Sequence, residues 1–184
     1  MNLTDFLEQK RAAILDRWFD IILQTYPEDT RRFLKRQKNR FANPVAHEII
    51  TGMEGLLDQL ASGSEAEEFS PFLDKVIRIR AVQEFSPSEA LGFIFALKDV
   101  VRAELSKEGQ EERYGTDLSD FDRSIDEVGL LSLDLYTKCR EKVYELRIKE
   151  VKNQVGRLLE KADLICKNPE ISDDLRDINL DLVT

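Results

Sequence analysis

The sequence predicts an all-α helical bundle of about six helices that ends in one long C-terminal helix. Apolar residues recur at helical spacing through most of the 184 residues. No stretch alternates apolar and polar residues over a useful length, and no Asn-Gly or Asp-Gly pair marks a hairpin turn. Proline and glycine separate the helical stretches, as is typical of helix boundaries.

Two helices are expected in the first part of the chain. The first covers about residues 4–25 with Thr4 as its N-cap, and Pro27 ends it. A short helix over about 28–37 follows. Its basic residues, with those just after it, form either a solvated helix face or a docking patch for an acidic partner or an anionic ligand. These residues are Arg31, Arg32, Lys35, Arg36, Lys38 and Arg40.

The third helix is expected over about residues 44–60. Asn43 and Pro44 stand there as N-cap and first helical residue, the order in which these two residue types favour a helix start. Gly52 and Gly55 lie inside this helix, where a glycine weakens it locally. Their presence predicts that another helix approaches closely at this point.

The next two helices are each expected to begin at a serine followed by a proline. Ser70-Pro71 is expected to open the fourth helix, with the serine as N-cap. Ser86-Pro87 opens the fifth, where Glu89 completes a capping box. The fifth helix is apolar nearly all round at its start, so that end should be buried. Gly92 predicts a second close crossing by another helix.

The last helix is expected to begin at Asp117 and to run to about Cys166. Beyond Tyr144 its apolar residues narrow to a stripe with alternating spacings of four and three, which is a heptad pattern. The pattern predicts either a parallel homodimeric coiled coil or an amphipathic helix that folds back on its own domain. The seam residues are Tyr144, Ile148, Val151, Val155, Leu158, Ala162 and Ile165.

The predicted organisation is thus a helical domain over residues 1–143, a coiled-coil helix over 144–166 and an acidic tail over 167–184. The net charge of −9 and the pI near 4.8 argue against nucleic acid and against an anionic membrane surface as partners. The chain starts without a signal-like segment, so we expect a cytoplasmic protein. Cys139 and Cys166 are too far apart on one helix to form a disulfide.

The residue chemistry contains no catalytic constellation, and we therefore expect a protein that is not an enzyme. A single histidine, His47, rules out a multi-histidine metal site, and no phosphate-binding glycine loop is present. Neither a metal nor a cofactor is expected. The alternative is a haem or another planar ligand held by His47 together with the aromatic residues Trp18, Phe93 and Phe95.

Arg78, Arg80 and Gln83 are the other candidate ligand-binding residues. The two arginines are two positions apart on an otherwise apolar helix, so they project in nearly opposite directions. At least one of them must meet apolar surroundings. It either pairs with a carboxylate and holds a helix junction, or it contacts an anion or a small molecule in a pocket beside Ser86.

Several segments of the chain resemble one known family. The segments are ILDRW (14–18), FANPVAH (41–47), VIRIRAVQ (76–83), FSPSEAL (85–91) and CREKVYELR (139–147). Together they resemble the N-terminal domain of RsbRD-type RsbT co-antagonist proteins, over about residues 10–150.

This resemblance implies a globin-like helical fold without haem that is usually dimeric. It also implies a sensory input domain in stress-response signalling, which passes its signal along the exit helix to an output domain of the STAS or histidine kinase type. No such domain follows within the 184 residues. The expected partners are therefore a second copy of the chain and a protein that carries the output domain. The signal and the identity of that protein are left open by the sequence.

Overall fold

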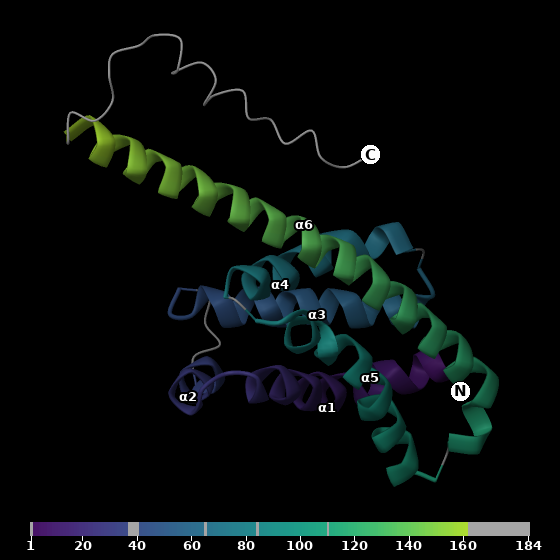
Figure 1. Cartoon of the computed structure of the whole chain (residues 1–184). Helices are drawn as coiled ribbons and strands as arrows, with labels where there is room; N and C mark the ends of the chain where they lie inside the picture. The colour runs from purple at the N-terminus through teal and green to yellow at the C-terminus, as the bar shows by residue number, and fades with distance from the viewer. Residues whose placement is uncertain (1, 37–40, 65, 84, 110, 162–184) are drawn as a thin grey trace. The chain divides into compact units, whose positions relative to one another are not determined.

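The computed structural model confirms the all-α prediction, with six α-helices, two short 3-10 helices and no strand among the residues it describes (Figure 1). The described residues are 2–36, 41–64, 66–83, 85–109 and 111–161. The chain divides into two compact units, Met1–Glu141 and Lys142–Thr184. No helix in the described ranges is both long enough and apolar enough to cross a membrane.

The helices follow one another with short connections. They are α1 (Leu3–Gln24), α2 (Glu28–Arg36), α3 (Pro44–Ser62), η1 (Ala66–Phe69), α4 (Ser70–Val82), α5 (Pro87–Lys107), η2 (Glu111–Tyr114) and α6 (Gly115–Lys161).

The capping residues are partly those expected from the sequence. Asn43 caps α3 through its side chain, and Ser86 and Glu89 form the predicted capping box of α5. The expectation that Thr4 caps α1 is wrong. Asn2 does so in a capping box with Asp5, while Thr4 lies in the first turn of α1 and its hydroxyl donates to the Ala61 carbonyl of α3 at 2.9 Å.

Two other helix starts also differ from expectation. Ser70 is not an N-cap, because η1 leads directly into α4 and places Phe69 at the cap position without a side-chain hydrogen bond. Similarly, α6 begins at Gly115 rather than Asp117, because η2 shortens the polar loop before it.

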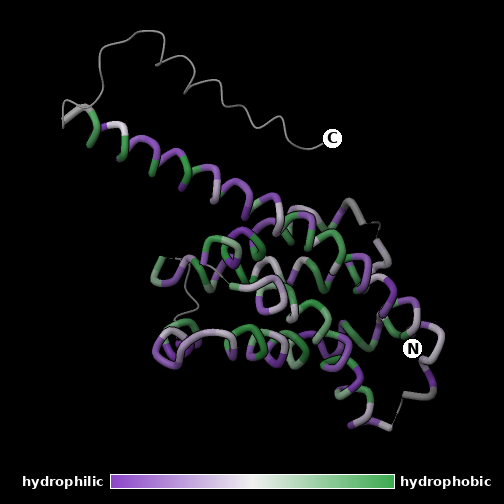
Figure 2. Tube along the Cα trace, in the orientation of Figure 1, coloured by the Kyte–Doolittle hydropathy of each residue, from purple (hydrophilic) through white to green (hydrophobic). Residues whose placement is uncertain are grey.

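The core of the first unit lies where α1 packs against both α3 and α5, with α4 packed on α3. Figure 2 shows hydrophobic residues recurring along these helices among hydrophilic ones. The buried side chains include Phe6, Ile14, Trp18, Ile49, Leu56, Leu73, Ile77, Ile94, Val101 and Ile125. Burial of each large apolar side chain contributes about 1.5–3 kcal/mol before the entropy of ordering is subtracted.

Within the first unit, α6 runs antiparallel to α5. The Lys98 ammonium on α5 donates to Asp126 on α6 at 2.6 Å, and Arg102 on α5 pairs with Asp122 on α6. Gly129 on α6 lies against a phenylalanine ring of α5, where an added Cβ would come within 2.3 Å of the ring. The first turns of α6 are therefore fixed in register along α5.

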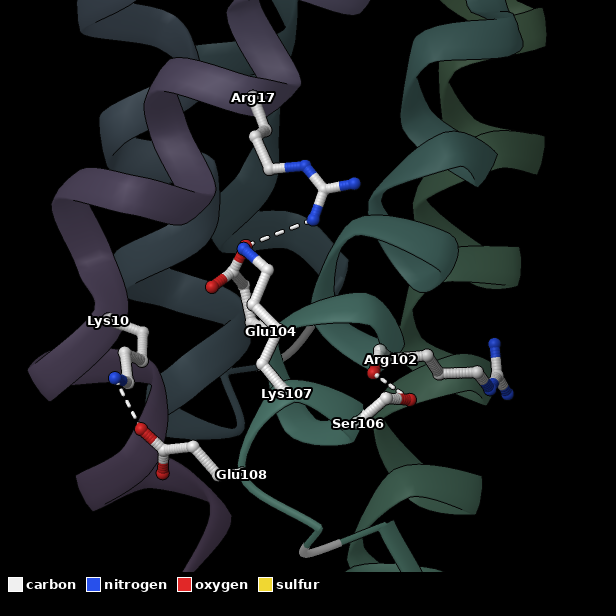
Figure 3. Close-up of polar contacts among 7 residues, drawn as sticks. All are labelled: Lys10, Arg17, Arg102, Glu104, Ser106, Lys107 and Glu108. Carbon is white, nitrogen blue, oxygen red and sulfur yellow. Dashed lines mark hydrogen bonds and ion pairs between the residues drawn. The ribbon is translucent and has the colours of Figure 1, made fainter.

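The buried carboxylate of Glu104 joins α1 to α5 (Figure 3). Its side chain is 5% exposed and accepts hydrogen bonds from the Lys107 ammonium at 2.6 Å and from the Arg17 guanidinium at 3.0 Å. These two cations, Lys107 first, hold the pKa of Glu104 below its usual range.

We predict that Glu104→Gln destabilises the protein in a pH-dependent way. The pKa of Glu104 is lower in the folded protein than the ordinary glutamate value. The carboxylate therefore contributes its full stabilisation above the ordinary glutamate pKa, and this contribution is lost as the pH falls through the pKa of the folded state. Urea unfolding at a series of pH values should show wild type and variant converging in acid. A difference that stays constant across the series would contradict this account.

A second prediction concerns the helix glycines. A Cβ on Gly52 would lie 2.5 Å from Val76 Cγ2 and 2.9 Å from the Phe72 carbonyl oxygen, so the predicted close approach at Gly52 is confirmed. The same expectation for Gly92 is wrong, because nothing lies within 4 Å of a Cβ built there.

Gly52→Ala should therefore lower the free energy of unfolding by about 1–3 kcal/mol through overpacking. Gly92→Ala should raise it by up to about 1 kcal/mol, because alanine favours the helix. Equal effects of the two substitutions in thermal and urea unfolding would be evidence against the packing of α3 on α4.

Candidate functional site

The two candidate arginines of α4 lie in opposite environments, as their spacing predicts. Arg80 is fully buried. Arg78 is exposed and donates to Asp74, one turn earlier, at 2.6 Å. The requirement that one arginine enters apolar surroundings is therefore met by Arg80.

The Arg80 guanidinium joins three helices through directional hydrogen bonds. Its Nε donates to the Ala90 carbonyl at 2.9 Å, and its Nη2 donates to the Glu89 carbonyl at 2.6 Å. The same Nη2 donates to Thr25 Oγ1, in the turn that ends α1, at 3.0 Å. Nη1 is buried with no hydrogen-bond partner among the described residues. No carboxylate in these ranges forms an ion pair with Arg80, so backbone carbonyls take the place of the expected carboxylate.

Aromatic rings surround the same guanidinium. Its central carbon lies 4.3 Å from the ring centre of Phe85, 5.6 Å from that of Tyr26 and 5.9 Å from that of Phe93. The faces of aromatic rings attract a cation electrostatically, most strongly where water is absent. Loss of hydration lowers the pKa of Arg80 and raises the pKa of the Tyr26 phenol. We call this cluster of Arg80, Thr25, Tyr26, Phe85 and Phe93 the Arg80 junction.

The connection between α4 and α5 is held from two sides. From α1, the Tyr26 hydroxyl donates to Gln83 Oε1 at 2.7 Å. From α6, the Tyr136 hydroxyl donates to the Phe85 carbonyl, and Arg140 Nη1 donates to the Ala81 carbonyl at 2.8 Å. The junction and α6 therefore contact the same short stretch of backbone.

The structure brings four of the six candidate ligand residues into one region. Arg80 and Gln83 contact Tyr26, and Phe93 contacts both Arg80 and Trp18. The Trp18 indole donates to the Phe93 carbonyl at 2.6 Å, and the two rings lie 5.9 Å apart.

The other two candidates stand apart from this cluster. Arg78 is exposed, and no hydrogen bond, ion pair or ring contact in the described part of the chain links His47 to the junction. The structure thus shows a contact between Trp18 and Phe93 but none that joins either of them to His47, and the planar-ligand site considered as the alternative stays a prediction. Within the ranges that the structure describes, no group of three potential metal ligands occurs either.

Sequence reasoning missed five residues of the site, which are Thr25, Tyr26, Phe85, Tyr136 and Arg140. The available signal was the tyrosines, whose hydroxyls usually find a partner when the ring is buried. Tyr26 directly precedes the proline between α1 and α2, and Tyr136 stands on the apolar face of α6. Nothing in the sequence indicates which carbonyl each hydroxyl would reach.

The described part of the predicted seam lies on α6 and is exposed, from 47% for Val155 to 65% for Leu158. Tyr144, Ile148 and Val151 fall between these values. Ala162 and Ile165 lie outside the described residues, as does Cys166. The dimeric coiled coil stays a prediction.

We predict that Arg80→Lys destabilises the protein by about 1–3 kcal/mol, because an ammonium cannot reproduce the forked contacts to two carbonyls and a hydroxyl. Arg78→Lys, on the same helix, should leave the free energy of unfolding essentially unchanged because that side chain is exposed. Urea unfolding of both variants measures the difference. If the two variants behaved alike, Arg80 would not have the structural role assigned to it.

Comparison with known proteins agrees with the resemblance noted in the sequence. The chain is 26% identical over 147 residues to an uncharacterized protein of Archaeoglobus fulgidus, covering 76% of this chain and 83% of that protein. No solved structure gives a significant match. The family described as the RsbT co-antagonist protein rsbRD N-terminal domain matches residues 12–151, which include the whole Arg80 junction. The chain therefore belongs to the RsbT co-antagonist protein rsbRD N-terminal domain family.

Proposed function

We propose that the chain is a non-enzymatic cytoplasmic input module that changes the state of a partner protein through α6. The family is named for co-antagonists of RsbT, which supports a regulatory role with a protein partner. The partner is proposed to carry an output domain of the STAS or kinase type, and the module is proposed to act as a homodimer.

One observation carries the proposal: the α4–α5 connection is shared by the buried Arg80 junction and by α6. Arg80 fixes the start of α5 through the Glu89 and Ala90 carbonyls. Tyr136 attaches α6 to Phe85 inside the same connection, and Arg140 attaches α6 to Ala81 in the last turn of α4 before it. A shift of α4 relative to α5 therefore moves the two carbonyl oxygens, of Ala81 and Phe85, that accept hydrogen bonds from α6.

The proposed change would reach the seam along α6. This helix spans Gly115–Lys161, so Tyr136, Arg140 and the exposed seam that begins at Tyr144 follow one another along the same helix. Helix displacements of about 1–2 Å at an interface are enough to switch packed assemblies. A small change at the junction can thus alter how the seam meets a second copy or a partner.

The exposed seam supports the homodimer. A row of large apolar side chains with a heptad spacing and charged flanks is typical of a helix that buries this face in a coiled coil. A charge inserted into such a seam is not tolerated, because it would be buried without a partner.

We predict that Val151→Glu converts the full-length dimer into a monomer. Lys152→Glu is the matched control, because it adds the same side chain one position away, on the charged flank. Light scattering coupled to size exclusion measures the mass of each protein. A dimer that survives Val151→Glu would move the interface to the first unit, and a monomeric wild type would remove the dimer from the proposal.

A further inference from the structure

An open cleft of about 280 Å³ lies between α1 and α2. Its last α1 residue, Gln24, directly precedes Thr25 of the Arg80 junction in the sequence. The volume of the cleft lies just below the range of about 300–1,000 Å³ that is usual for small-molecule pockets in proteins, so only a small ligand would fit. Three of its lining side chains are cationic and one is a carboxylate. The lining residues are Asp20, Leu23, Gln24, Arg31, Arg32 and Lys35.

The cations of the cleft are not equally engaged. The Lys35 ammonium donates to both carboxylate oxygens of Asp20, at 2.8 and 3.1 Å, and thereby joins α2 to α1. Arg32 pairs with Glu28 within α2. The Arg31 guanidinium is partly buried and has neither a hydrogen bond nor an ion pair among the residues that the structure describes. Arg31 therefore has unused hydrogen-bond donors in the cleft, whereas the charges of Arg32 and Lys35 are already paired with carboxylates.

Among the described residues that line the cleft, Leu23 is the one apolar residue. It belongs to the hydrophobic core and is 1% exposed, so it offers a ligand little apolar surface. A planar guanidinium recognises carboxylate and phosphate oxygens through two parallel hydrogen bonds. Because the cleft is small and mostly lined by polar side chains, it suits an anion with only a short carbon skeleton.

We propose that this cleft binds a small organic oxyanion, a carboxylate or phosphate compound on a short carbon skeleton, through Arg31. The proposal deepens the input role and rests on it, because the ligand supplies the signal for the Arg80 junction. Leu23 and Gln24 of the cleft are followed directly by Thr25 and Tyr26 of the junction. Closure of α2 on a bound anion therefore acts on the turn of α1 that contacts the buried guanidinium.

Amide NMR of the full-length protein tests the cleft. Inorganic phosphate and citrate are titrated separately at constant ionic strength, and the tighter-binding anion distinguishes a phosphate from a carboxylate ligand. The expected result is a saturable change at residues 23–24 and 31–35. Arg31→Gln should weaken this binding at least about tenfold, the effect of losing a charge-assisted hydrogen bond.

Two further variants sharpen the test. Arg36→Gln removes the same charge from the same helix at an exposed position outside the cleft, and it should bind as wild type does. Arg31→Lys keeps the charge and loses the fork, so its affinity should fall between those of Arg31→Gln and wild type. Non-saturating changes spread over the protein, or equal binding by Arg31→Gln and Arg36→Gln, would overturn the cleft as a ligand site.

The same spectra separate the ligand site from the input role. The anion site and its coupling to α6 are both supported if saturable changes at the cleft are accompanied by changes at residues 85–86 and 136–140. Changes confined to the cleft would uphold the anion site and contradict its coupling to α6.

Discussion

The buried guanidinium of Arg80 is the interaction on which the arrangement of the first unit depends. A cation removed from water is costly unless hydrogen bonds and neighbouring charges compensate it. Two backbone carbonyls, a threonine hydroxyl and three aromatic rings compensate the charge of Arg80. These groups come from three segments, which are the turn after α1, the connection after α4 and the start of α5. These groups compensate the charge only while the three segments keep their positions. The guanidinium therefore couples their positions in a way that an apolar side chain of the same volume would not.

The same coupling gives the fold a route from its core to α6. The ion pairs between α5 and α6 set the register of the two helices, and the Tyr136 and Arg140 hydrogen bonds extend the contact to the α4–α5 connection. Buried packing and backbone hydrogen bonds on this route resist gradual deformation, and we therefore propose that a change in the junction is passed on as a displacement of whole elements. The chain belongs to a family named for co-antagonists of RsbT, and this membership supports a regulatory role for the route from the core to α6.

The sequence predicted those parts of the fold that depend on local patterns. Helical periodicity located all six helices, and the Ser86–Glu89 capping box and the Asn43 cap were read correctly because their partners are three residues away. The N-caps assigned to Thr4 and Ser70 failed where a neighbouring asparagine or a 3-10 turn competed for the same role. For the site, helical geometry required one buried arginine, but it could not choose Arg80 over Arg78. That choice, and the contacts with Tyr26 and Tyr136, arise from residues about 55 positions apart along the chain, which no local pattern encodes.

The central claim is that Arg80 and α6 are coupled through the connection they share, and a double-mutant cycle tests it most directly. Arg80→Lys and Tyr136→Phe each remove one of the two attachments, and their effects on the free energy of unfolding are measured singly and together. Coupled residues should deviate from additivity by about 0.5 kcal/mol or more. Additivity within about 0.3 kcal/mol would show that the two attachments act independently and would contradict the account.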